Sequence, residues 1–241
     1  MHRFRHTTAI LILFAMCCYH VPGLAQDKWR NLAYKNIPVS TVSRLHPRAN
    51  SRETITGRRE ASNGFTWNYR YDVVLKQSAL IVKVGINTIP AQGLNRFDLD
   101  RVKPAWEKGI ERIWSHRFAL ETSEGRRYPI IVDVSFKGPR FHHDVIVRPG
   151  SGRTDELNWN VLDSLALVSH EFGHMIGMYD EYHKGALAPQ GAIIDPASIM
   201  TSNPAGDAAP HARHYEPFRS WFVSKTMMSN VRIIHEKGSH E

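Results

Sequence analysis

Two histidines and a glutamate in the second half of the chain have a spacing that suits metal chemistry. Residues 168–174 read Val-Ser-His-Glu-Phe-Gly-His, which puts His170 and His174 four positions apart in an apolar segment. Side chains four residues apart in a helix project from the same face, so both imidazoles can reach one metal ion. Glu171 lies next to the first histidine and can reach a water on that ion without binding the ion itself.

This arrangement predicts hydrolytic chemistry. Zinc lowers the pKa of a bound water towards about 7, and a nearby carboxylate can take its proton as the water attacks a carbonyl group. We therefore predict that His170 and His174 bind Zn²⁺ and that Glu171 is the general base. The alternative, two histidines exposed on a helix surface, is disfavoured by the apolar residues that share the segment: Leu162, Leu165, Val168, Phe172, Met175 and Ile176.

A third metal ligand is expected shortly after this helix, because a catalytic zinc usually has three protein ligands. Gly177 can adopt a left-handed conformation, which would end the helix and turn the chain back towards the metal. Asp180, three residues further on, could then supply an oxygen. Glu181 is a close rival and Asp195 a distant one, and the spacing favours Asp180.

Residues 170–180, HEFGHMIGMYD, resemble the extended metzincin motif H-E-x-x-H-x-x-G-x-x-H, with Asp180 in place of the last histidine as in the snapalysin-type branch. The resemblance implies a metzincin-like zincin with a twisted mixed sheet, an active-site helix, a long irregular segment bearing a methionine turn, and a C-terminal helix. Met200 resembles that methionine. Many metzincins carry an oxyanion-stabilising tyrosine two residues later, where this chain has Ser202, so other candidates for the role are open: Tyr182, Tyr215, His211 and His214.

Hydrophobic periodicity predicts the elements that must position these residues. Alternating apolar residues predict strands over 65–75, 79–89, 128–136 and 144–147. Helical spacing predicts a helix within 97–118 that starts near Arg101 because Pro104 interrupts the pattern, a buried helix over 160–178, and an amphipathic helix over 215–234. Residues 185–210, rich in Gly, Pro and Ala, are predicted to be irregular. The interleaved order of strands and helices indicates an α+β fold.

The first 25 residues have the layout of a secretory signal peptide. Residues 1–6 carry two arginines and no acid, an apolar run follows over 9–18, and small residues lead up to Ala25. The apolar run is too short to span a bilayer core of roughly 30 Å, so we expect no stable membrane insertion and a secreted or periplasmic location. Cleavage after Ala25 would remove Cys17 and Cys18, the only cysteines, which leaves histidines and carboxylates as metal ligands.

The 241 residues fit one domain with an extension: we predict a polar N-terminal extension of unknown role over 26–70 and a zinc metallopeptidase domain over 71–241. The net charge of +8 permits an anionic partner without requiring one. A protein or peptide substrate is expected, with no nucleic acid, and no oligomeric state is indicated. Two alternatives stay open: an amidase acting on cell-wall peptides, and a non-catalytic zinc-containing binding module, which has no use for the base Glu171.

Overall fold

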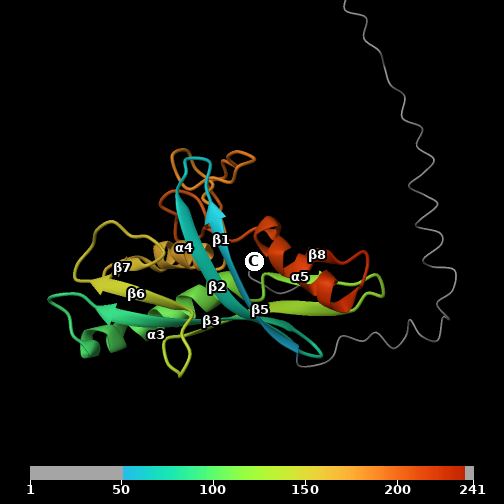
Figure 1. Cartoon of the computed structure of the whole chain (residues 1–241), viewed down its shortest axis with the longest axis horizontal. Helices are drawn as coiled ribbons and strands as arrows, with labels where there is room; N and C mark the ends of the chain where they lie inside the picture. Colours follow the sequence, from blue (N-terminus) through green and yellow to red (C-terminus); the bar gives the residue numbers. More distant parts are fainter. Residues whose placement is uncertain (1–50, 237–241) are drawn as a thin grey trace, which may run out of the picture. The chain divides into compact units, whose positions relative to one another are not determined.

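A curled mixed sheet and three α-helices make up residues 51–236, the part of the chain that this computed structural model describes (Figure 1). This architecture confirms the predicted α+β class. The elements in chain order are β1 (Ser51–Glu60), β2 (Thr66–Leu75), β3 (Leu80–Pro90), α3 (Arg96–Trp114), β4 (Phe118–Glu121), β5 (Arg127–Ser135), β6 (His143–Arg148), β7 (Asn158–Asn160), α4 (Leu165–Met175), the 3-10 helix η1 (Ala212–Tyr215), α5 (Glu216–Thr226) and β8 (Arg232–His235).

The long strand β3 joins two halves of the sheet. Its first residues pair with β2 in antiparallel and with β5 in parallel orientation, whereas residues 86–90 pair in parallel with β6. β7 continues the parallel ladder on β6, and β4 with β8 extends the opposite end in antiparallel orientation. The sheet is therefore parallel at its centre and antiparallel where β1 and β2, and β4 and β8, are added.

The helix α3 starts earlier than the predicted Arg101. The side chain of Asn95 accepts hydrogen bonds from the backbone N–H groups of Phe97 and Asp98, and the Asp98 carboxylate accepts one from the Asn95 N–H at 2.9 Å. This reciprocal capping box fixes the N-terminus, and the helix then runs through Pro104 rather than starting there.

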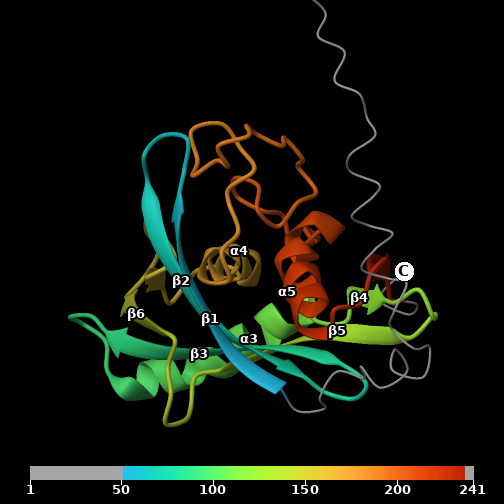
Figure 2. The same ribbon diagram turned by 45° about the vertical axis from the view of Figure 1, so that its right-hand side comes forward.

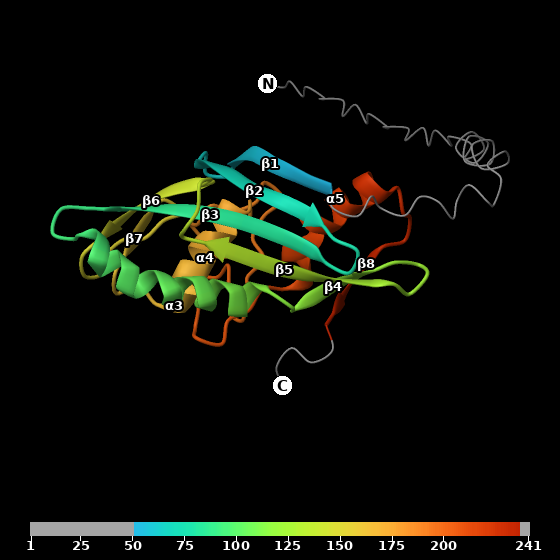
Figure 3. The same ribbon diagram turned by 90° about the horizontal axis from the view of Figure 1, so that it is seen from below.

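The two long helices lie against each other and the sheet (Figure 3). α3 runs along β5, and the indole N–H of Trp114 at its end donates to the backbone oxygen of Ser169 in α4 at 3.0 Å. Ser164 caps α4, which is shorter than the predicted 160–178 because residues 158–160 form β7 instead. Among the described residues, no helix combines the length and the apolar character needed to cross a membrane.

Residues 51–70 belong to the sheet, which corrects the prediction of a separate extension over 26–70. β1 pairs with β2 along its whole length, and β2 pairs with β3, so the predicted domain start at residue 71 falls inside β2. The strand β1 does not show in the apolar pattern because it is a polar edge strand, whose residues alternate only between exposed and half-buried. Residues 26–50 and the predicted signal peptide lie outside the described part of the chain.

The predicted C-terminal helix over 215–234 is also too long. α5 ends at Thr226 because Met227 adopts a left-handed conformation with φ 57°, and the chain then forms β8 on β4. The short strands β4, β7 and β8 were not predicted, since three or four residues are too few to show a periodicity.

The phenol of Tyr215 ties the end of α3 to α5, and its removal should destabilise the fold. Its hydroxyl donates to the backbone oxygen of Trp114 at 2.6 Å inside the core. Tyr215→Phe leaves that buried carbonyl without its donor, so we expect urea denaturation to show a loss of about 1–3 kcal/mol in the free energy of unfolding. Tyr128→Phe is the matched control, because the buried Tyr128 hydroxyl has no hydrogen-bond partner within residues 51–236. Equal losses in the two variants would contradict this role.

Candidate metal centre

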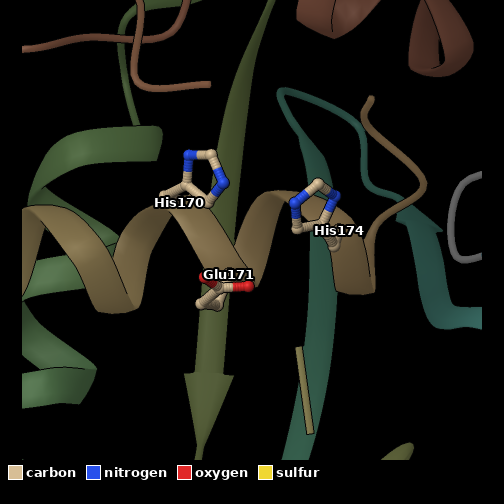
Figure 4. Close-up of side chains that lie close together, drawn as sticks. All are labelled: His170, Glu171 and His174. Carbon is tan, nitrogen blue, oxygen red and sulfur yellow. The ribbon is translucent and has the colours of Figure 1, made fainter. Parts of the chain in front are cut away.

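Helix α4 brings His170, Glu171 and His174 together in buried surroundings. Their ligand-capable atoms all lie within 4.8 Å of one another, and the close-up shows the three side chains on neighbouring turns of the helix (Figure 4). Apolar neighbours such as Val168 and Phe172, both fully buried, hold this helix in the core. These three side chains could together hold a metal ion.

Two backbone carbonyls orient the imidazole rings. Nδ1 of His170 lies 3.0 Å from the oxygen of Ile199, and Nδ1 of His174 lies 2.9 Å from the oxygen of Met178. A carbonyl oxygen only accepts, so each Nδ1 donates its proton and, in the neutral ring, each Nε2 presents a lone pair. Such partners for the second ring nitrogen commonly fix the tautomer and orientation of metal-binding histidines.

Asp180 completes a three-atom arrangement with these rings. Its Oδ1 lies 3.1 Å from Nε2 of His170 and 3.3 Å from Nε2 of His174. Its Oδ2 accepts a hydrogen bond from the N–H of Ala186 at 2.5 Å, whereas the buried Oδ1 lacks a hydrogen-bond partner among the described residues. A tetrahedral zinc site with bonds of about 2.0–2.1 Å has donor atoms about 3.3–3.4 Å apart, which is close to the two distances from Asp180 Oδ1 to the histidine nitrogens.

The electrostatics of the site show the same attraction for positive charge. Burial raises the pKa of Asp180, but the imidazoles of His170 and His174 beside its carboxylate outweigh that effect and hold the pKa well below its usual value. Burial lowers the pKa of His174, yet the Asp180 carboxylate outweighs it and the net shift is upward. Glu171 differs, because desolvation by burial raises its pKa to about 8.

Gly177 turns the chain as the sequence predicted. It has a φ of +89°, which disfavours residues with a side chain, and a Cβ there would lie 3.2 Å from the Tyr69 ring. The helix ends in hydrogen bonds from the N–H of Gly177 to His174 and from the N–H of Met178 to Gly173, both 2.9 Å. The chain then reverses and brings Asp180 back to the two histidines.

The rival carboxylates point elsewhere. Arg213 donates to both oxygens of Glu181 at 2.6 and 2.7 Å, and Nε2 of His214 lies 3.1 Å from one of them. Burial raises the pKa of Glu181, but Arg213 and His214 hold it far below its usual value. Asp195 pairs with Arg213 and His211, both at 3.2 Å. The structure thus brings Asp180, and neither rival, to the histidine pair.

Met200 lies directly against the motif helix. It is fully buried, and a Cβ added to Gly173 would collide with its sulfur. Its backbone oxygen accepts a hydrogen bond from the N–H of Glu181 at 2.9 Å, and the preceding residue, Ile199, holds the ring of His170. The irregular segment after α4 therefore holds the ring of His170 and the backbone of Glu181, the residue next to Asp180.

The β1–β2 hairpin reaches this end of α4, a contact that the sequence analysis missed. The tip of the hairpin lies beside the loop that follows α4 (Figure 2). The indole N–H of Trp67 donates to the backbone oxygen of His174 at 3.1 Å, and its ring meets the His174 ring edge-on. At the tip, Ser62 and Asn63 donate to backbone oxygens of residues 185–187. The sequence predicted a strand that includes Trp67, but no local pattern indicated that this strand contacts α4.

Arg59 of the hairpin holds the Gly177 turn. Its Nε donates to the backbone oxygen of Gly177 at 2.9 Å, and its guanidinium lies over the rings of Tyr69 and Tyr179 at 5.0 and 5.4 Å. Cation–π contact and hydrogen bond together restrict the residue from which the chain turns towards Asp180. The sequence offered no signal for this role, since Arg59 is one of several arginines in a polar stretch.

A cleft of about 360 Å³ opens over the site, and Glu171 and the three residues His170, His174 and Asp180 line it. Among the four candidates for stabilising an oxyanion, Tyr182 lines this cleft. The others are engaged away from it: Tyr215 bonds to Trp114, His214 to Glu181, and His211 to Asp195.

Comparison of the chain with protein-family models, with curated proteins and with solved structures finds no match in any of the three. A function is therefore inferred from the site itself, from its donor atoms, its buried glutamate and the cleft above them.

Replacing Asp180 and Glu181 one at a time by alanine should separate the effect on metal binding from the effect on stability. We expect Asp180→Ala to weaken zinc binding at least about 10-fold, because it removes the unpartnered oxygen between the two imidazoles. Glu181→Ala should keep the zinc affinity within about threefold and instead lower the free energy of unfolding, since it leaves Arg213 and His214 without their carboxylate. Chelator competition and urea denaturation measure the two effects. The reverse ranking of the affinities would contradict the placement of Asp180.

Removal of the Arg59 side chain should weaken zinc binding, although Arg59 does not contact the metal-binding side chains. Arg59→Ala removes the donor to Gly177, and we expect a loss in zinc affinity of about 3–10-fold, less than for a residue bonded to a ligand itself. Arg58→Ala makes the same change of charge at an exposed neighbour whose side chain donates a hydrogen bond to Thr66. It should bind zinc as the wild type does. An equal weakening by both variants would point to a general effect of charge.

Proposed function

We propose that this protein is a secreted, zinc-dependent metallopeptidase of the metzincin-like type, which hydrolyses peptide bonds. The observation that carries the proposal is the position of Asp180 Oδ1, buried and unpartnered, 3.1 and 3.3 Å from the Nε2 atoms of His170 and His174. A carboxylate oxygen this close to two imidazole nitrogens is stabilised by positive charge, which either a proton on one imidazole or a metal ion among the three atoms can supply. Two imidazoles and a carboxylate are a donor set that zinc accepts.

The chain's own residues have distinct roles in this proposal. His170, His174 and Asp180 hold the metal and leave one position open towards the cleft. When bound, zinc supplies a Lewis acid that polarises the scissile carbonyl and makes water more acidic. Glu171 takes a proton from the attacking water and passes it to the leaving amine. Tyr182, in the wall of the same cleft, is placed to donate to the carbonyl oxygen as negative charge develops there.

Two features favour catalysis over a purely structural metal. A catalytic zinc keeps one position open to water or substrate, and the cleft above these side chains provides such an opening. Glu171, buried beside the ligand-capable atoms, is a base that a structural site would not need. The resemblance of residues 170–180 to the metzincin motif and the predicted signal peptide support a secreted peptidase.

Glu171→Gln should separate metal binding from turnover. We expect zinc content and thermal stability to stay near the wild-type values, while peptide hydrolysis falls by about 10²–10⁴-fold because the base is lost. The measurements are elemental analysis and cleavage of casein and of a peptide library, with the exposed Glu124→Gln as control. Wild-type turnover in Glu171→Gln would overturn the assignment of the base. A wild-type protein that binds zinc and cleaves no peptide would overturn the proposed activity.

A further inference from the structure

A second cavity shares two of its lining residues with the metal cleft. It has a volume of about 780 Å³ and lies where β6 ends and β7 begins. Arg153 and Asp155, in the loop between these strands, line both this cavity and the metal cleft. An extended chain lying in the cleft can therefore continue into this neighbouring groove, which we call the arginine groove after its residues Arg148 and Arg153.

The Arg148 side chain is held in place in the groove. Its Nη2 donates to Oδ1 of Asn158 at 2.8 Å, and Nδ2 of Asn158 donates to Oδ1 of Asp155 at 2.7 Å. The same Asp155 oxygen also accepts the N–H of Leu157 at 3.0 Å. The Asp155 carboxylate is thus already hydrogen-bonded by Leu157 and Asn158 of its own loop. The chain of hydrogen bonds through Asn158 orients the Arg148 guanidinium before any ligand binds.

The charges of the groove are unbalanced. Within residues 51–236, neither Arg148 nor Arg153 has a carboxylate within the 4.0 Å of an ion pair, although other arginines such as Arg213 and Arg219 do. A guanidinium presents several N–H donors in a plane that matches a carboxylate, and arginine is favoured where carboxylates are recognised. Glu156 lines the metal cleft but not the groove, so the two neighbouring cavities differ in charge.

We propose that the arginine groove binds an acidic side chain of the peptide substrate, at a position away from the bond that is cut, and so selects acidic peptides. This inference rests on the proposed function and adds the substrate class to it. Arg153 sits at the boundary between groove and cleft, where it contacts the acidic residue of a chain whose scissile carbonyl lies over the metal site.

The test compares matched peptides that differ only in charge. A peptide that the wild type cleaves is remade with Glu or Gln at each position in turn, always with an amidated C-terminus. We expect Glu to raise kcat/KM about 10-fold over Gln at one position on one side of the cut. In the double variant Arg148→Gln/Arg153→Gln the Glu-to-Gln ratio should fall to near one. The control Arg140→Gln changes an exposed arginine that lines neither cavity and should keep the ratio.

Binding measured apart from cleavage keeps this inference separate from the proposed activity. Fluorescence anisotropy of the same labelled Glu and Gln peptides, with the Glu171→Gln protein, should show the Glu preference and its loss in the combined arginine variant. Cleavage without a Glu preference, or a preference that persists after Arg148 and Arg153 are replaced, would overturn the groove and leave the metallopeptidase standing. Equal binding of the Glu and Gln peptides to the Glu171→Gln protein would likewise overturn the groove.

Discussion

The rest of the site depends on one cluster of electron-rich atoms, the Oδ1 atom of Asp180 and the Nε2 atoms of His170 and His174, which positive charge stabilises. Asp180 Oδ1 lies 3.1 Å from Nε2 of His170 and 3.3 Å from Nε2 of His174, and all three residues are largely buried where they line the cleft. A proton on one imidazole or a metal ion among the three atoms can supply the positive charge that such a cluster needs. Each surrounding contact serves to hold these atoms in place: carbonyls fix the two rings, and the amide of Ala186 holds the carboxylate.

The candidate ligands come from elements of unequal rigidity. The two histidines stand on α4, which is packed on α3 and the sheet, and a helix in a core holds its side chains well. Asp180 stands on a loop, so its position depends on neighbours that are distant in sequence. The hairpin residue Arg59 restrains the preceding turn, and Met200 binds the backbone of the following residue. Because one of the candidate ligands lies on a loop, the site needs contacts such as those of Arg59 and Met200 to hold that ligand in place.

The extended backbone at Asp180 and Glu181 directs these two neighbouring carboxylates to opposite sides of the chain. Asp180 forms a parallel bridge with Leu187, and successive side chains in extended backbone point to opposite sides. Asp180 therefore faces the histidines, while Glu181 faces Arg213 and His214. The ion pair of Glu181 also ties this loop to η1, which carries both partners.

The local parts of the site were determined by the sequence alone. His170, Glu171 and His174 share one helical segment, and Gly177 permits the turn after it, because spacing and glycine act through local geometry. The central strands and the α+β class followed from periodicity for the same reason. Only the tertiary structure decided that polar residues 51–60 form an edge strand, that Trp67 and Arg59 reach α4, and that Arg213 draws Glu181 away from the histidines. The contacts of Trp67, Arg59 and Arg213 join residues that are more than thirty to more than a hundred positions apart, and a local pattern does not encode which distant partner a side chain meets.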